Sequence, residues 1–66
     1  MIRVLHIFGI MNIGGAETMI MNIYRNIDRS KIQFDFLCMS KEKGDYEEEI
    51  KQLGGKIYKI EAPSKV

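Results

Sequence analysis

Three short apolar runs alternate along this 66-residue chain with two segments of helical periodicity. The runs lie at residues 2–8, 33–39 and 56–60. Each connection between them is longer than the dozen or so residues that a crossover between parallel strands needs, whereas antiparallel neighbours need only a short hairpin. The order β-α-β-α-β therefore predicts an α/β fold, a Rossmann-like arrangement with three parallel strands.

The first run, IRVLHIF, carries apolar side chains on both alternating sets of positions. Ile2, Val4 and Phe8 fall on one set, and Leu5 and Ile7 on the other. This pattern is typical of a strand covered on both faces. Parallel crossovers are right-handed in about 98% of cases, so strands added in one direction would place both helices on one face. We therefore expect this chain to be the first part of a larger doubly wound domain, or to cover its other face by self-association.

The first helical segment begins at Ala16. Its apolar residues follow helical spacing and predict one wide buried stripe, with Met21 off it; the stripe comprises Ala16, Met19, Ile20, Ile23, Tyr24 and Ile27. Met19 and Met39 are expected in the core, whereas Met11 and Met21 are candidates for an acceptor or partner surface.

The second helical segment has the pattern of a capping box. Asp45 is expected as N-cap with Glu48 at the third helical position, and the pair Gly54 and Gly55 supplies the left-handed stop. The glutamates at 47–49 are expected to form a solvated helix start. Residues 61–64 are expected to form an exit loop.

Composition excludes several classes of function. Ten Lys and Arg against nine Asp and Glu give a net charge of +1, and nucleic-acid binding needs a more basic face. The single cysteine, Cys38, excludes an internal disulfide and a multi-cysteine zinc site. We expect no metal, and a cytoplasmic location, because no signal peptide is recognisable. His6 is expected to be a buried or interface residue and Cys38 a small core residue, because neither has a visible catalytic partner.

The loop GIMNIGG at residues 9–15 follows the first strand, where ligands bind in open α/β sheets. Gly14 and Gly15 stand directly before a helix, whose N-terminus offers free N–H groups and partial positive charge. A phosphate or diphosphate is the predicted ligand. The alternative is that the two glycines only serve a tight turn. Asn12 is expected either to bind a sugar or phosphate or to stabilise the turn.

Two familiar phosphate loops do not fit. Gly9 and Gly14 have the spacing of a P-loop, but Gly15 and Ala16 replace its Lys and Ser/Thr. A dinucleotide fingerprint is broken because the first triplet is GIM. The acid that such a site needs at the end of the second strand is also missing, since Asp35 lies mid-strand.

The run FGIMNIGGAE at residues 8–17 closely resembles the first strand, loop and helix of the GT-B-fold glycosyltransferases, in particular the large retaining group that uses nucleotide sugars. The loop of that family ends in G-G-[AV]-E, which Gly14, Gly15, Ala16 and Glu17 match. The FDFL of the second run, a G-x-[YF]-x-x-x-[IL]-x-x-x-G helix at residues 44–54 and the KIY of the third run are also similar. The resemblance covers nearly the whole chain.

The resemblance implies that residues 1–66 form the N-terminal part of a Rossmann-like, acceptor-side domain in a larger GT-B enzyme. Such an enzyme moves a sugar from a nucleotide-sugar donor to a saccharide or lipid-linked acceptor, without a further cofactor and with possible peripheral membrane association. Gly14 and Gly15 would face the donor diphosphate or the acceptor. Glu17 would lie in the first helical turn, as a ligand contact or as a partner of the helix dipole.

The donor domain of that family carries two glutamates eight positions apart, which this chain lacks. We therefore expect the donor domain to be absent and these 66 residues alone to be inactive, and we assign no catalytic residue. Two alternatives are another nucleotide-binding Rossmann protein and a small flavodoxin-like module that associates with itself.

Overall fold

The computed structural model of the chain describes residues 1–61. The elements are β1 (Ile2–Phe8), α1 (Gly15–Asn26), β2 (Ile32–Cys38), α2 (Glu47–Gln52) and β3 (Lys56–Lys59). The predicted order of elements is confirmed, with boundaries displaced by one or two residues. Of the expected exit loop, residues 62–64 lie outside the described part of the chain.

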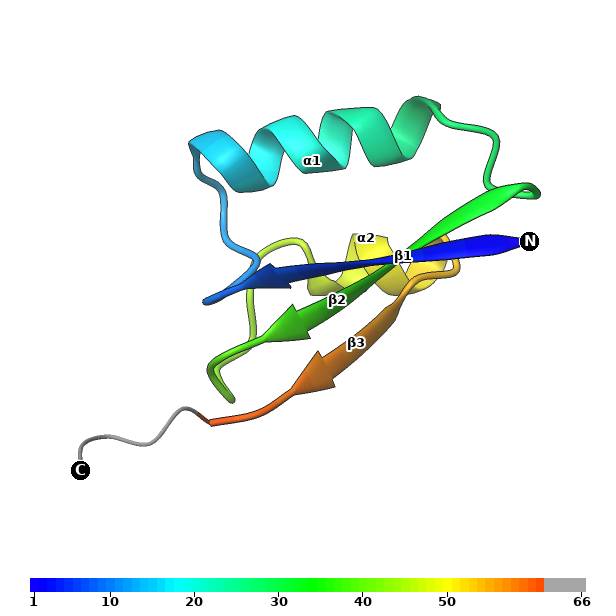
Figure 1. The fold of residues 1–66 in the computed structure, drawn as a ribbon. Helices are drawn as coiled ribbons and strands as arrows, with labels where there is room; N and C mark the ends of the chain where they lie inside the picture. Colours follow the sequence, from blue (N-terminus) through cyan, green and yellow to red (C-terminus); the bar gives the residue numbers. More distant parts are fainter. Residues whose placement is uncertain (62–66) are drawn as a thin grey trace.

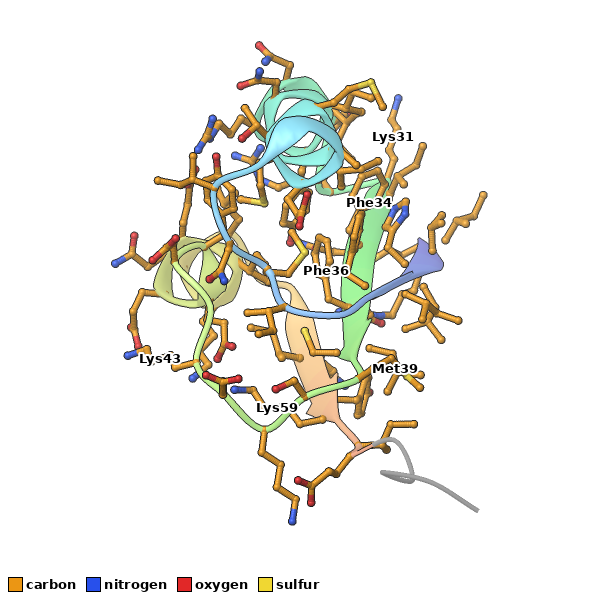
Figure 2. All side chains as sticks on the ribbon, turned by 90° about the vertical axis from the view of Figure 1, so that its left-hand side faces the viewer. Lys31, Phe34, Phe36, Met39, Lys43 and Lys59 are labelled. Atoms are coloured by element: carbon orange, nitrogen blue, oxygen red, sulfur yellow. The ribbon has the colours of Figure 1, made fainter. Side chains whose placement is uncertain are left out.

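The three strands form one parallel sheet in the order β1-β2-β3. Ile7 of β1, Leu37 of β2 and Tyr58 of β3 lie side by side in the register. Both helices lie on the same side of this sheet (Figures 1 and 2). The chain therefore has the expected α/β, Rossmann-like arrangement, and its helices share one face, as right-handed crossovers in one direction require.

The core lies between β2 and the two helices. Phe34, Phe36 and Cys38 of β2 are buried and point to the helix side. The ring of Tyr24 on α1 stacks on Phe34 with centroids 5.0 Å apart, and Ile50 of α2 is fully buried. The helix-facing side of β2 thus supplies the apolar surface that both helices cover.

The predicted stripe on α1 is partly wrong. Met21 is fully buried beside Tyr24, whereas Met19 and Ile23 are 58% and 45% exposed. The apolar residues of this helix form a wide stripe, and periodicity cannot say which edge of that stripe meets the sheet. The helix is rotated so that Met21 faces inward.

The methionine expectations were also wrong, and for the same reason. Met11 is fully buried like Met21, so neither borders an exposed surface. Met39, expected in the core, is exposed on the side of the sheet away from the helices (Figure 2). A flexible thioether suits either place, so the residue type alone does not decide burial.

The capping prediction for α2 was wrong. The N-cap position is Tyr46, with no side-chain cap, and Glu47 begins the helix. Glu47 is 3% exposed, so it is not solvated as expected. Its Oε2 accepts the Gly44 N–H at 2.6 Å and pairs with Lys59 Nζ at 2.9 Å. At the other end, Gly54 has the predicted left-handed conformation, with φ +96°.

An ion pair between β1 and the middle of β2 fastens the strands together. The Arg3 guanidinium donates to both carboxylate oxygens of Asp35, at 2.8 and 2.6 Å. The Asp35 Oδ1 also accepts the backbone N–H of Lys56 at 3.1 Å. The bonds from Arg3 hold the pKa of Asp35 below its ordinary value. Asp35 therefore joins β1, β2 and β3 and is not free to act as a ribose ligand.

The side of the sheet away from the helices carries large exposed apolar side chains. We call it the open face; its exposed members are Leu5, Ile7, Met39, Tyr58 and Ile60, and Leu37 among them is half-buried. Within residues 1–61, no helix covers this face (Figure 1). None of the described helices is long and apolar enough to cross a bilayer.

Candidate functional site

The loop at residues 9–15 lies at the carboxyl end of β1, and Figure 2 looks onto this rim of the sheet. Gly14 is the N-cap of α1, with φ −162° and ψ 177°. This is extended backbone that any residue adopts. The sequence therefore placed the loop and the helix start correctly, at the edge where open α/β sheets bind ligands.

Neither glycine before α1 is required by the packing of the described residues. A Cβ on Gly15 would meet nothing within 4 Å, and neither residue has a positive φ. The atoms nearest to a Cβ on Gly14 would be those of the Glu17 carboxylate, a flexible side-chain end, at 3.0 Å and beyond. The conformation of the turn does not require two glycines. Because they have no side chains, the space in front of the helix N-terminus stays empty.

The first N–H groups of α1 face that space. Helical bonding starts when the Thr18 N–H donates to the Gly14 carbonyl at 2.9 Å. The N–H groups of Gly15, Ala16 and Glu17 have no acceptor within residues 1–61. Such groups carry the partial positive charge of the helix start. An oxyanion or a sugar oxygen could accept hydrogen bonds from these N–H groups.

Glu17 lies in the first turn of α1, as expected. Its carboxylate is folded back toward Gly14, where the positive end of the helix dipole favours a negative charge. An anion arriving at the amides would have to displace this side chain. A sugar hydroxyl could instead donate to it.

Asn12 is tied into the loop. Its Oδ1 accepts the backbone N–H of Asp45 at 3.1 Å, and its own N–H donates to the Ile10 carbonyl at 2.9 Å. The side-chain oxygen of Asn12 therefore stabilises the turn. Only its Nδ2 group remains as a donor for a ligand.

The sequence missed a second loop that supports the first, at residues 44–46. The Tyr46 N–H donates to the Met11 carbonyl at 2.9 Å. A Cβ on Gly44 would lie 2.6 Å from the same carbonyl oxygen. The Tyr46 hydroxyl also lies 2.7 Å from Thr18 Oγ1 in the first turn of α1. The glycine two positions before an aromatic residue was visible in the sequence, but its contact joins residues 33 positions apart.

Cys38 occupies the core, as expected, whereas His6 is half-buried at its edge. The His6 ring packs edge-on against Phe34, with centroids 4.3 Å apart, and burial lowers its pKa. Cys38 is fully buried, and the loss of hydration raises its thiol pKa. Both environments favour the neutral form of the side chain.

The described residues hold neither an enclosed pocket nor a group of three His, Cys, Asp or Glu that could bind a metal. Residues 9–17 form one open surface, which we call the wall. It consists of two glycines without side chains, the free amides and one carboxylate. This wall can bind polar or anionic groups, but within residues 1–61 it has no facing wall.

Comparison with known proteins finds a relative named "Putative glycosyltransferase EpsF" from Bacillus subtilis (strain 168). The two are 53% identical over 58 residues, which is 88% of this chain but 15% of that protein. The chain thus spans less than a sixth of its relative's length. No family model matches the chain, and no solved structure matches it significantly.

Proposed function

We propose that these residues form the N-terminal, acceptor-side part of a nucleotide-sugar glycosyltransferase with a GT-B fold. Two observations support this proposal. One is the identity to a segment of a protein named as a glycosyltransferase. The other is the run Gly14, Gly15, Ala16 and Glu17 at the carboxyl-end rim of a parallel sheet.

The observation that carries the proposal is a glycine, Gly15, that the fold does not need. Glycine at a helical position lowers stability relative to alanine, and no close contact requires it at Gly15, the first residue of α1. Places where a chain breaks a local rule without a structural gain are typical of functional sites. Here the gain is access: a ligand can approach the backbone amides directly.

Each residue of the wall has a role in this proposal. The amides of Gly15 and Ala16 donate to the donor diphosphate or to an acceptor oxygen. Glu17 accepts hydrogen bonds from sugar hydroxyls, and Asn12 donates through Nδ2. The groups that stabilise the transition state come from a second domain, so this segment alone does not transfer sugar.

The acceptor is a saccharide or a lipid-linked saccharide, and the complete protein acts in the cytoplasm, at the membrane surface where the acceptor is lipid-linked. A nucleotide-binding Rossmann protein of the NAD type is less compatible with the structure. The acid that its ribose needs at the end of β2 is missing, and the carboxylate of β2 itself, Asp35, is committed to Arg3.

The test is a chimera in which this chain replaces the matching segment of EpsF. Release of nucleoside diphosphate is measured with UDP-glucose, UDP-N-acetylglucosamine and GDP-mannose as donors. Gly15→Val is expected to lower kcat/KM by at least about tenfold, which corresponds to about 1.4 kcal/mol of lost stabilisation.

The matched control is Gln52→Val. Gln52 is exposed in the last turn of α2, at the far end of the sheet from the loop. It should leave turnover unchanged. Full turnover in a folded Gly15→Val chimera would contradict the glycine site. A folded chimera that consumes none of these donors, with native EpsF active under the same conditions, would contradict the assignment of function.

A further inference from the structure

The side chain of Lys59, the last residue of β3, is bonded to the loop between β2 and α2 (Figure 2). Its Nζ donates to the backbone carbonyl oxygens of Lys41 and Glu42, at 3.3 and 3.0 Å. The same atom lies 2.9 Å from Oε2 of Glu47, the first residue of α2. An ammonium group has three N–H donors and no acceptor. These three oxygens can therefore accept every hydrogen bond that Lys59 has to give.

The carboxylate of Glu47 extends this contact into the loop. Its Oε2 also accepts the Gly44 N–H at 2.6 Å. Burial opposes a negative charge at Glu47, but the hydrogen bonds from Lys59 and Gly44 outweigh it and hold the pKa of Glu47 below its ordinary value. The carboxylate is therefore charged at neutral pH, and one oxygen atom joins the ammonium group to the Gly44 amide.

No buried side chain anchors residues 41–43, the middle of this loop. All three side chains are exposed, so apolar packing does not fix the course of the backbone there. The ion pair between Lys43 and Glu48 is exposed as well, and exposed pairs contribute little. The hydrogen bonds from Lys59 are therefore what closes this part of the loop onto β3.

The last residues of the same loop support residues 9–15, which we call the glycine loop. The Tyr46 N–H donates to the Met11 carbonyl at 2.9 Å. The Asp45 N–H donates to the side chain of Asn12 at 3.1 Å. A series of polar contacts thus runs from the end of β3, through the loop before α2, to the loop that follows β1.

Stability alone gives no strong reason for the pair of Lys59 and Glu47. Removing charges from water is costly, and replacing a buried ion pair by apolar side chains of similar size is often neutral or stabilising. Its polar contacts do fix one arrangement of the backbone around them. At a binding site such an arrangement matters, because a displacement of about 1 Å can cost about a hundredfold in rate. Groups that contact a ligand therefore need supporting contacts behind them.

We infer that Lys59 is a positioning residue, which together with Glu47 holds the loop before α2, and through it the glycine loop, in the geometry that binds the donor diphosphate. The inference rests on the proposed function for the identity of this ligand. The mechanical connection between Lys59 and the glycine loop does not depend on sugar transfer.

A positioning role and a merely structural role predict different kinetics. If the glycine loop contacts the donor equally before and in the transition state, loosening the loop raises KM and leaves kcat nearly unchanged. If the pair serves only stability, its loss lowers the number of folded molecules. The apparent kcat then falls, and KM stays as it was.

The choice of variants keeps the protein folded. Lys59→Met alone would leave the buried charge of Glu47 unpaired, which is strongly destabilising. The test variant therefore combines Lys59→Met with Glu47→Gln, which removes both charges and keeps a side-chain oxygen for the Gly44 N–H. The matched control makes the same two changes in an exposed pair at the same rim, as Lys41→Met with Glu61→Gln.

Both double variants are made in the EpsF chimera. Hydrogen exchange of residues 9–15, followed by mass spectrometry, should quicken about fivefold in the test variant and stay unchanged in the control. KM is measured for whichever of UDP-glucose, UDP-N-acetylglucosamine and GDP-mannose the chimera consumes. It should rise about tenfold in the test variant with kcat nearly unchanged, and the control should keep both values.

Unaltered exchange in a folded test variant would overturn the inference. So would a lowered kcat with unaltered KM, since that result assigns the pair to stability alone. Gly15→Val in the same chimera separates this inference from the proposed function. If Gly15→Val impairs turnover and the test variant does not, only the role of Lys59 is wrong. If Gly15→Val has no effect either, the proposed glycine site is wrong, and the exchange of residues 9–15 alone decides whether Lys59 positions the loop.

Discussion

The carboxylate of Asp45 accepts the backbone N–H of Ile13 at 3.2 Å, across the carboxyl-end rim of the sheet. In return, the Asp45 N–H donates to the side-chain oxygen of Asn12 at 3.1 Å. The loop after β1 and the loop before α2 are therefore one hydrogen-bonded unit. The glycines that form the candidate site connect this unit to α1.

Asp45→Ala should loosen the glycine loop without unfolding the chain. A hydrogen bond of this kind contributes about 1 kcal/mol, so exchange of the Ile13 amide should quicken about fivefold, as measured by NMR hydrogen exchange. Asp45→Asn keeps a side-chain oxygen and should exchange nearly as slowly as the native chain. Equal rates in all three proteins would show that this bond does not hold the loop.

Gly44→Ala should destabilise the chain by about 2 kcal/mol, within the range for overpacked sites. Its Cβ would lie 2.6 to 2.8 Å from three backbone atoms of Met11, which cannot move independently of the loop. Urea unfolding measures the change. Gly9→Ala is the matched control, since its Cβ meets nothing within 4 Å. A Gly44→Ala protein as stable as Gly9→Ala would mean that the two loops separate at little cost.

These contacts show which features of the fold can be predicted from the sequence and which cannot. Periodicity and connection lengths predicted the strand order, the shared helix face and the position of the glycine loop, because each follows from local pattern and chirality. The partner of Asp45 could not be predicted in this way. Its spacing to Glu48 fits a capping box, but its carboxylate bonds to Ile13, which is 32 positions away.

The prediction of which side of α1 is buried was wrong for a related reason. Met21 and Met19 are both compatible with an apolar surface, and only the position of the sheet decides that Met21 is buried and Met19 exposed. Glu47 was likewise assigned to solvent from its neighbours in sequence. Its partner Lys59 comes from β3, so the pair exists only after the third strand has paired.

Stability should fall as the pH is lowered from 7.5 to 5. Burial lowers the pKa of His6 in the folded chain, while the unfolded chain keeps a value near 6.5. Between these two values the unfolded state binds more protons, so the free energy of unfolding rises with pH. Urea unfolding at several pH values measures the slope.

His6→Leu should flatten this slope, because it removes the titrating imidazole. The substitution breaks no hydrogen bond of the buried Nε2, which has no partner within the described residues. The carboxylates of Asp35 and Glu47 also have lowered pKa values. Their contributions are present at neutral pH and are lost only under more acid conditions, as the pH falls from the ordinary carboxylate values through the lowered ones. An unchanged slope between pH 5 and 7.5 in His6→Leu would assign the effect to another group.

Gly15→Ala should separate stability from function at the candidate site. Gly15 is the first residue of α1 and has space for a Cβ, so alanine should stabilise the chain by about 0.5 to 1 kcal/mol through helix propensity and a less flexible unfolded state. If the amides bind a ligand at close range, the same methyl group obstructs it. The expected result is a higher urea midpoint together with a raised KM for donor or acceptor in the EpsF chimera. Higher stability with unaltered kinetics would mean that the bare backbone at Gly15 has no part in binding.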